Sequence, residues 1–206
     1  MVSEEDVRAV FADVARAIEE HQSELDRLDA VAGDGDHGAT MVMGLRAVTA
    51  ALPDGEEPVA ELLRIAAVRF ASVGGSTGPL WGTALLRAAQ SLEGAGTADL
   101  SAIAAAAEAA AQGIADRGKC AEGQKTLLDV MAPAARALSS AAASGAEPAT
   151  AAAQACDAAR AGLEATRALE PRHGRARLAS ERSRGHEDAG AASALLVWET
   201  AAAQVR

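Results

Sequence analysis

Alanine is the feature of this chain that most limits its fold. Stretches such as residues 101–112 are largely alanine, which has the highest helix propensity of any residue. Hydrophobic residues make up 50% of the 206, whereas aromatic residues make up 2% and tyrosine is absent, so little of the sequence favours strands. A chain that is half apolar is too hydrophobic to stay disordered. We therefore predict an all-α fold.

Apolar residues recur at helical spacing through most of the chain. The first helix is predicted after Ser3, which with Asp6 matches a capping box, and Asp188 is the predicted N-cap of the last. Pro79 suits the first position of a helix, and residues 22–32 also look helical. Short connections favour antiparallel neighbours, so we expect an up-and-down bundle of about eight helices in one domain, residues 1–206. After the first, the predicted helices run near 38–51, 58–73, 79–92, 98–116, 125–143, 148–168 and 189–204.

Charge and composition exclude several classes of protein. The net charge of −10 argues against a nucleic-acid binder, since affinity for nucleic acid is built mostly from Lys and Arg. No long apolar segment lacks charge, so we expect no membrane span, and the N-terminus does not resemble a signal peptide. Cys120 and Cys156 do not make a disulfide framework. We expect a cytoplasmic protein with free thiols and with Cys156 in the core.

Residues 29–40 form an acidic, glycine-rich loop. Asp29, Asp34 and Asp36 lie within eight positions. Converging carboxylates repel by about 4 kcal/mol per pair at roughly 4 Å and an effective dielectric constant near 20. A loop that gathers three of them calls for a cation, and oxygen ligands suit a hard ion such as Mg²⁺. A solvated acidic turn is the alternative that the spacing leaves open.

Two other motifs fail in this loop. Gly33, Gly35 and Gly38 match the spacing of a dinucleotide-binding fingerprint, but that fingerprint follows a strand and residues 22–32 look helical. A calcium-binding EF-hand loop starting at Asp34 would need an oxygen ligand where Gly38 stands and a Glu where Leu45 stands. Neither motif explains the loop.

Three further connections carry polar or charged residues. Ser76 and Thr77 precede a predicted helix, where free N–H groups and hydroxyls make either an anion site or an ordinary N-cap turn. Residues 117–126 nearly match a phosphate-binding P-loop, but Gln124 interrupts the motif and no strand precedes it. The basic segment, residues 171–190, either clamps phosphate or is a solvated loop. It contains Arg172, His173, Arg175, Arg177, Arg182, Arg184 and His186.

Together these loops fit a metal–nucleotide site for phosphoryl transfer. Four segments, containing A-G-D-G-D-H-G-A-T, V-G-G-S-T-G-P-L-W, R-G-K-C-A-E-G-Q-K-T and H-G-R-A-R-L-A-S-E-R-S, strongly resemble the L subunit of dihydroxyacetone kinase, in the order of that family. The same domain forms the C-terminal half of single-chain kinases. The resemblance implies an antiparallel barrel of eight amphipathic helices with the nucleotide, ATP or ADP, at one rim.

The resemblance also implies roles for individual residues. Asp29, Asp34 and Asp36 match the ligands of two Mg²⁺ ions, and Arg175 matches an arginine of the site to which we assign a catalytic role. Positions that match nucleotide-binding residues are His37, Gly38, Ala39, Thr40, Ser76, Thr77, Gly118, Leu127, Arg175, Asp188, Ala189 and Gly190. Because aromatic residues are scarce, we expect the adenine to lie against aliphatic side chains, with Leu127 as one wall.

The resemblance implies that the ketose, dihydroxyacetone or a sugar such as erythrulose, is held covalently by a separate K subunit. The sequence leaves the phosphoryl donor open. ATP would be exchanged at each turnover, or a permanently bound ADP would be rephosphorylated by a phosphotransferase-system phosphocarrier. A non-catalytic nucleotide-binding regulator is a third reading, and a homodimer is left open. The chain departs from the family at Thr40, at Gln124, at Ala189 and in R-L-A-S after Ala176.

Overall fold

The structure is a computed structural model that describes residues 1–94 and 98–205. Those residues form helices and connections, with no β-strand among them. Two short 3₁₀ helices, at Thr166–Ala168 and Arg175–Ala179, accompany the α-helices. The α-helices are α1 (Glu4–Glu20), α2 (Gln22–Ala30), α3 (His37–Thr49), α4 (Val59–Ala71), α5 (Thr77–Ser91), α6 (Leu100–Gly118), α7 (Leu128–Ala143), α8 (Pro148–Ala165), α9 (Ser180–Ser183) and α10 (Ala189–Ala203).

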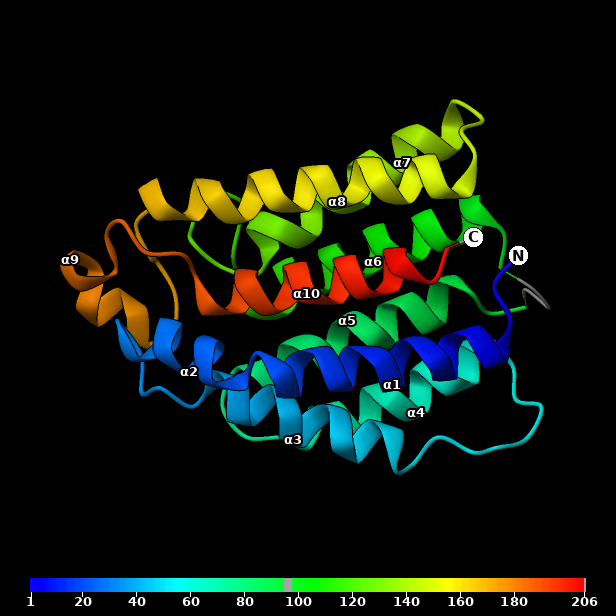
Figure 1. The fold of residues 1–206 in the computed structure, drawn as a ribbon, viewed down its shortest axis with the longest axis horizontal. Helices are drawn as coiled ribbons and strands as arrows, with labels where there is room; N and C mark the ends of the chain where they lie inside the picture. The colour runs from blue at the N-terminus through cyan, green and yellow to red at the C-terminus, as the bar shows by residue number, and fades with distance from the viewer. Residues whose placement is uncertain (95–97, 206) are drawn as a thin grey trace.

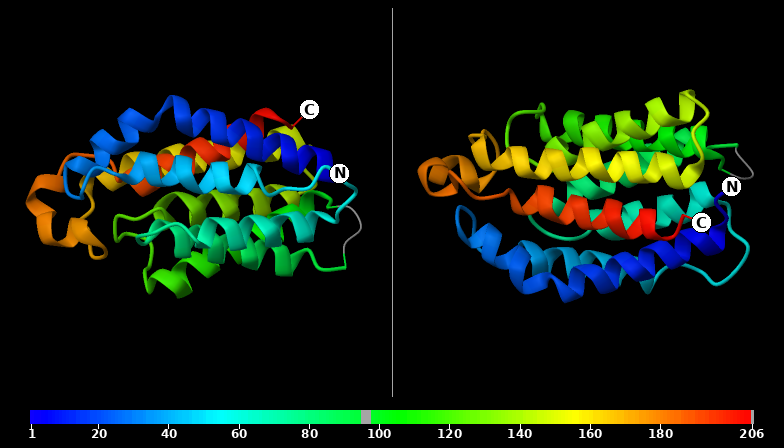
Figure 2. Two further views of the ribbon diagram at one scale, coloured as in Figure 1. Left: turned by 90° about the horizontal axis from the view of Figure 1, so that it is seen from below. Right: turned by 45° about the horizontal axis from the view of Figure 1, so that its top comes forward.

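In the described residues, eight long helices close into a barrel, whose arrangement is seen in Figures 1 and 2. Each of α3 to α7 packs against the next helix in the chain, and α10 packs against both α8 and α1. Helix α1 contacts α3, which completes the ring. The prediction of an all-α, up-and-down barrel is therefore confirmed, and the eight segments found by periodicity are its eight long helices. The short helix α2 packs against α3 and α10 at one end.

The predicted helix ends follow the capping chemistry. Ser3 and Asp6 form the expected capping box, and the Asp188 side chain accepts a hydrogen bond from the Ala191 N–H. Helix α5 differs from the prediction because it begins at Thr77, so Pro79 is its third residue rather than its first. The Leu80 N–H donates to the Ser76 carbonyl, which starts the helical bonding two residues early. Proline lacks an N–H group, but this costs no hydrogen bond at the third position, because the first N–H groups of a helix have no partner within it.

Small residues bring the barrel helices close together. A Cβ added to Gly162 in α8 would lie 2.1 Å from the Asp129 carbonyl oxygen in α7, so this contact requires glycine. Many alanines are buried at the other interfaces, and the rings of Phe70 in α4 and Trp81 in α5 pack together with their centroids 6.2 Å apart. Cys156 is buried, as predicted. In the described residues, no helix is long and apolar enough to cross a membrane.

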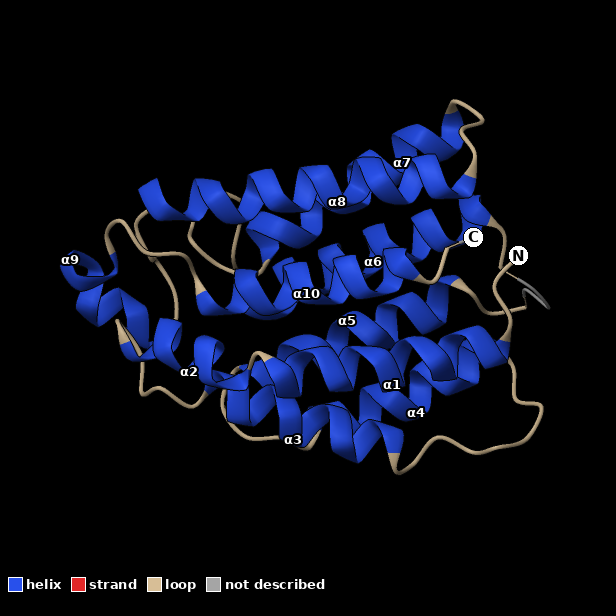
Figure 3. Cartoon of the chain, in the orientation of Figure 1, coloured by secondary structure: helices blue, strands red, loops and turns tan. Residues whose placement is uncertain are grey.

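An up-and-down order places alternate connections at the same end of the barrel. The connections α2–α3, α4–α5, α6–α7 and α8–α10 meet at one end, and the two chain termini lie at the other (Figures 1 and 3). These four connections contain the four segments that the sequence singled out. Topology alone therefore gathers the acidic loop, the Ser–Thr turn, the P-loop-like turn and the basic segment at one rim.

Candidate functional site

A cavity of about 870 Å³ opens at this rim, between the four connections. Its lining combines carboxylates, hydroxyls, glycines and aliphatic side chains with residues of the basic segment. All but two of the residues assigned by resemblance line it. The lining residues among them are Asp29, Asp34, Asp36, His37, Thr40, Ser76, Thr77, Gly118, Leu127, Arg175, Asp188, Ala189 and Gly190.

The three aspartates of the acidic loop converge. Oxygen atoms of Asp29, Asp34 and Asp36 all lie within 4.8 Å of one another. Asp29, near the end of α2, fixes the loop because its Oδ2 atom accepts the N–H groups of Gly35 (2.8 Å) and Asp36 (3.2 Å). A Cβ on Gly33 would lie 2.2 Å from Oδ1 of Asp29, so any larger residue there would displace this carboxylate.

The donor set of this cluster fits a hard divalent cation. It consists of carboxylate oxygens alone, and Asp34 and Asp36 are exposed to the cavity while Asp29 is half-buried. Mg²⁺ prefers a few carboxylates together with water and phosphate oxygens. Mutual repulsion of the three carboxylates would be relieved by such an ion. The residues present are therefore suited to hold Mg²⁺.

His37 begins α3 and connects three helices. Its Nε2 atom lies 2.9 Å from the Ser193 hydroxyl of α10, and its Nδ1 atom lies 3.4 Å from the Thr77 hydroxyl of α5. Because the Ser193 hydroxyl donates to the Gly190 carbonyl, it accepts from His37, which assigns the proton to Nε2. Burial lowers the pKa of His37, although Asp29 and Asp26 act in the opposite direction. This neutral ring orients Thr77 at the cavity wall.

Gly38 and Ala39 are the two assigned residues that do not line the cavity. A Cβ on Gly38 would lie 2.3 Å from the Gln22 carbonyl oxygen, so Gly38 lets α3 approach α2. The Ala39 N–H donates to the Asp26 carboxylate over 3.1 Å. Both residues face α2 and support the acidic loop from behind, whereas Thr40, one turn along α3, borders the cavity.

The Ser–Thr turn forms the wall next to α3. Ser76 is the N-cap of α5 but its side chain makes no capping hydrogen bond, so its hydroxyl is not used by the helix. The N–H groups of the first turn of a helix carry partial positive charge. Ser76, Thr77 and the start of α5 therefore present hydroxyl and N–H donors to an anion in the cavity.

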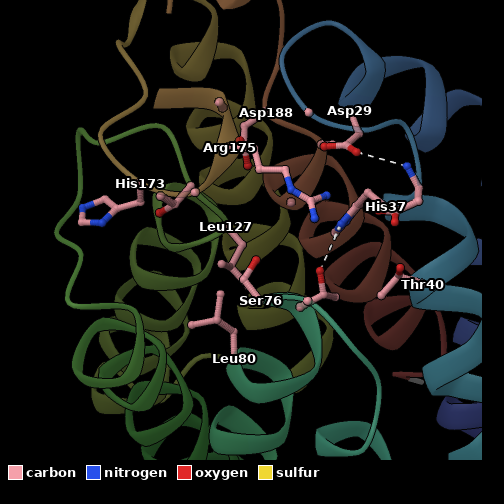
Figure 4. A pocket seen from close by; sticks show the side chains of 18 of the residues that line it. Asp29, His37, Thr40, Ser76, Leu80, Leu127, His173, Arg175 and Asp188 are labelled. Carbon is pink, nitrogen blue, oxygen red and sulfur yellow. Dashed lines mark hydrogen bonds between the residues drawn. The ribbon is translucent and has the colours of Figure 1, made fainter. Parts of the chain in front are cut away.

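The wall of the cavity that lies away from the acidic loop is apolar. Leu127 and Leu80 lie together on it, away from the acidic loop (Figure 4). Gly118 leaves room for this wall, since a Cβ there would lie 3.0 Å from Cys120 Sγ and 3.2 Å from a Leu80 methyl carbon. Trp81 also contributes to the lining, but it is buried and paired with Phe70. Sequence reasoning did not identify Leu80, Cys120 or Trp81 as part of the site.

Asp188 to Gly190 close the rim at the start of α10. The Asp188 carboxylate accepts the Ala191 N–H over 2.8 Å, and the Asp188 N–H donates to the Thr166 hydroxyl. Burial raises the pKa of Asp188 to about 6, helped by the charges of Asp129 and Asp29 and opposed by the Ala191 hydrogen bond and Lys125. This group can therefore exchange a proton near neutral pH.

The basic segment crosses the rim opposite the acidic loop. Its Gly174 has a φ of 61°, and the following 3₁₀ helix directs Arg175 into the cavity, where it forms an ion pair with Asp34 (Figure 4). The neighbouring Leu178 is 83% exposed. Of the two readings that the sequence left open, the structure favours a segment that presents an arginine to the site.

Sequence reasoning missed the residues that support the P-loop-like turn. The buried Asp129 carboxylate accepts the N–H groups of Gly123 (2.5 Å) and Thr126 (2.8 Å), which shapes the turn. Lys125 lines the cavity and donates from Nζ to two carbonyl groups of the basic segment. An Asp three residues after a Thr near a helix start is a capping pattern, so Asp129 had a local signal. Lys125 had none.

Comparison with known proteins places the chain in a family. The model of the DAK2 domain matches residues 31–203. The D-erythrulose kinase of Mycolicibacterium smegmatis is 38% identical over 212 residues, which cover 98% of this chain but 37% of that protein. The ADP-binding subunit DhaL of the PEP-dependent dihydroxyacetone kinase 1 of Listeria innocua is 35% identical, over 90% of this chain and 89% of that subunit.

A solved structure agrees with the sequence relatives. The dihydroxyacetone kinase of C. freundii in complex with AMP-PNP and Mg²⁺ superposes with a TM-score of 0.74 at 25% identity. The superposition covers 98% of this chain and 34% of the C. freundii chain, so the present chain spans about a third of that kinase. The rim cavity, the barrel and these relatives agree, and the chain belongs to the DAK2 domain family, as a DhaL-type subunit.

Proposed function

We propose that this chain is the nucleotide-binding subunit of a ketose kinase and supplies the phosphoryl group from ATP. The observation that carries the proposal is the convergence of three aspartates opposite Arg175 across one cavity, in a chain of the DAK2 family. The ADP-binding subunit DhaL of Listeria innocua, which is matched over 90% of this chain and 89% of that subunit, supports a nucleotide-binding role. The ketose would be held by a separate K subunit.

Asp29, Asp34 and Asp36 are the residues that would hold Mg²⁺, and we propose two ions. The ions would neutralise the charge of the phosphate groups and keep them in place. The protein's own part is to fix the carboxylates: Asp29 is held by two backbone N–H groups, and Gly33 leaves room for its side chain. No residue of this chain needs to act as a covalent nucleophile.

The remaining lining divides into a phosphate side and an adenine side. Ser76, Thr77 and the N–H groups at the start of α5 would donate to phosphate oxygens, with Thr77 oriented by His37. Arg175 extends over the acidic loop, so its guanidinium would stabilise negative charge on the transferred phosphoryl group. Leu127, Leu80 and Gly118 would contact the adenine through aliphatic surface.

The other readings are weighed by the same residues. A non-catalytic regulator is not favoured, because the three converging aspartates and Arg175 are both present and the relatives are kinases. The relatives include PEP-dependent subunits and an erythrulose kinase. The experiment below therefore compares dihydroxyacetone with erythrulose as the ketose, and ATP with bound ADP as the phosphoryl donor. A phosphocarrier as second partner, a homodimer and a place in the cytoplasm remain predictions.

The experiment is phosphorylation of dihydroxyacetone and of erythrulose by the purified chain, with and without a K subunit. ATP is compared with a phosphoenolpyruvate-driven phosphotransferase system, and ketose phosphate is measured. We expect product with ATP that requires both Mg²⁺ and the K subunit. Product with phosphoenolpyruvate alone would assign the donor to bound ADP, and no product with either donor would overturn the proposed function.

A further inference from the structure

The basic segment is attached to the barrel at both of its ends. Its first residues contact Gln124, because the Arg172 N–H donates to the Gln124 carbonyl (3.3 Å) and His173 Nε2 lies 2.5 Å from Gln124 Oε1. Its returning part contacts the next residue, Lys125, whose Nζ donates to the carbonyls of Ser183 and His186, each over 2.8 Å. Adjacent residues of the P-loop-like turn therefore hold both ends of the segment.

Lys125 is unusual for a lysine in its environment. Only 5% of it is exposed, and its ammonium is bound by main-chain carbonyls of the basic segment. Burial lowers its pKa, and Asp188 acts in the opposite direction. A buried cation is costly unless it is fully hydrogen-bonded. The contact therefore depends on both carbonyls lying in place, which ties the returning part to this one side chain.

The turn that carries Lys125 is itself built for this position. Lys125 has a φ of 57°, in the left-handed region, which residues other than glycine rarely adopt. The Asp129 carboxylate holds the backbone on either side of it, through the N–H groups of Gly123 and Thr126. Such a conformation persists only where surrounding contacts enforce it. The returning part is also held by Arg167, whose guanidinium forms a partly exposed pair with Glu187 at 2.8 Å and whose carbonyl accepts the Gly185 N–H over 3.0 Å.

Arg175 lies between these two attachments and makes an ion pair with Asp34 across the cavity. We infer that Lys125 is a positioning residue: it fastens the returning part of the basic segment, so that Arg175 faces the acidic loop during phosphoryl transfer. This inference rests on the proposed function for its effect on catalysis. Lys125 would act through Arg175, so its loss should slow transfer without removing the nucleotide.

The chain offers a matched control, because Lys119 and Lys125 are its two lysines. Lys119 belongs to the same connection and is also left-handed, with a φ of 49°, but it is exposed and does not line the cavity. Lys125→Met and Lys119→Met thus remove the same group from similar backbone. Each variant would be assayed for Mg²⁺–ADP affinity by calorimetry and for kcat and KM of ketose phosphorylation with the K subunit.

We expect Lys125→Met to lower kcat at least tenfold while the Mg²⁺–ADP affinity and the KM for ATP change less than threefold. Lys119→Met should match the wild type in all three. In an Arg175→Ala background, Lys125→Met should slow transfer by less than twofold, because its effect passes through Arg175. An unchanged kcat, an equal loss of kcat and affinity, or a full tenfold effect in the Arg175→Ala background would each overturn the inference.

A second readout does not depend on catalysis. Cleavage by an arginine-specific protease after Arg175, Arg177, Arg182 and Arg184 would be followed by mass spectrometry. We expect Lys125→Met to be cleaved there at least fivefold faster than Lys119→Met, and equal rates would contradict the inference. If the wild type transfers no phosphoryl group, the proposed function fails, and the protease comparison still decides whether Lys125 holds the segment.

Circular dichroism would reveal any loss of helix in Lys125→Met. Lys125→Arg then serves in its place, because it keeps the cation and its donors on a longer side chain. We expect that variant to bind Mg²⁺–ADP like the wild type and to have a kcat between those of the wild type and Arg175→Ala. A kcat equal to that of the wild type, with unchanged protease cleavage, would overturn the inference.

Discussion

The acidic loop and the basic segment face each other across the same cavity, but they are held in place in different ways. The acidic loop is local: Asp29 binds the N–H groups of Gly35 and Asp36, and glycines remove the steric conflicts. The basic segment is held by side chains that are distant in sequence, since Lys125 lies 58 and 61 positions from Ser183 and His186. The acidic loop is shaped by contacts within itself, whereas the basic segment is held by contacts with distant residues.

This difference has a functional consequence. The three carboxylates of the proposed metal site lie within eight residues, so local contacts keep them together even if other parts of the barrel shift. An arginine on a segment that is fastened from outside can be displaced by substitutions far from it. We therefore expect changes in the acidic loop to affect binding first, and changes around the basic segment to affect the rate of transfer first.

The largest effect is expected from Asp34→Ala. Removing one of three converging carboxylates should lower the Mg²⁺-dependent affinity for ADP at least a hundredfold, because only Asp29 and Asp36 of that cluster would remain. Calorimetry measures the affinity, and circular dichroism should show the wild-type helical content. Wild-type affinity in this variant would refute the assignment of the metal site.

Arg175→Ala should separate the two walls most clearly. Removing its guanidinium should slow phosphoryl transfer by about a hundredfold or more, as expected for the loss of one preorganised donor to developing negative charge. ADP affinity should change much less, because Arg175 is largely exposed and the acidic loop is intact. Steady-state kinetics and calorimetry on the same preparation provide the test, and an equal loss in both would argue against a role in the transition state.

Gly33→Ala tests whether the acidic loop is fixed locally. Its Cβ would meet the Asp29 carboxylate at 2.2 Å, so the carboxylate must move and Mg²⁺ affinity should fall about tenfold. Gly55→Ala is the control, because nothing lies within 4 Å of its added Cβ and its φ is not positive. Equal Mg²⁺ affinities for the two variants would show that the loop adapts freely.

A smaller effect concerns pH and Asp188. Its pKa rises from 3.8 to about 6 in the folded chain, so the folded state binds this proton more tightly than the unfolded state. Stability from this group is therefore present at low pH and is lost as the pH rises through 6. Asp188→Asn keeps an N-cap side chain without the charge.

That variant should equal the wild type in stability near pH 4 and exceed it by about 1–2 kcal/mol above pH 7, a value reduced from the full shift because the group borders the cavity. Urea unfolding of the nucleotide-free proteins across this range measures the difference. If the wild type instead became more stable than the variant as the pH rose, the raised pKa of Asp188 would be contradicted.

The sequence was most informative where structure is local. Helical periodicity identified the eight long helices, and the spacing of Asp29, Asp34 and Asp36 predicted a gathering of carboxylates, which the structure brings within 4.8 Å of one another. The order of the helices then explains why the four connections meet, since alternate turns of an up-and-down barrel share an end. The 3₁₀ helix at Arg175 and the short helix α9 were not predicted, because their residues lack apolar periodicity.

Long-range contacts were beyond the reach of the sequence. The two residues Gly38 and Ala39, next to the proposed metal ligands in sequence, face α2 because helix α3 turns them away from the cavity. Lys125 was recognised as part of a failed P-loop motif and of a segment that resembles the family, with no role of its own. Its contacts with the basic segment arise from tertiary packing, for which no spacing in the sequence gives a signal.

The most direct test of this account is the Mg²⁺ dependence of ADP affinity in the wild type, Asp34→Ala and Arg175→Ala. Calorimetric titrations with saturating Mg²⁺ and with a chelator give the ratio of affinities for each protein. We predict a ratio of at least a hundred for the wild type and for Arg175→Ala, and a ratio near one for Asp34→Ala. Wild-type binding that is unaffected by the chelator would contradict the central claim that the acidic loop binds the nucleotide through Mg²⁺.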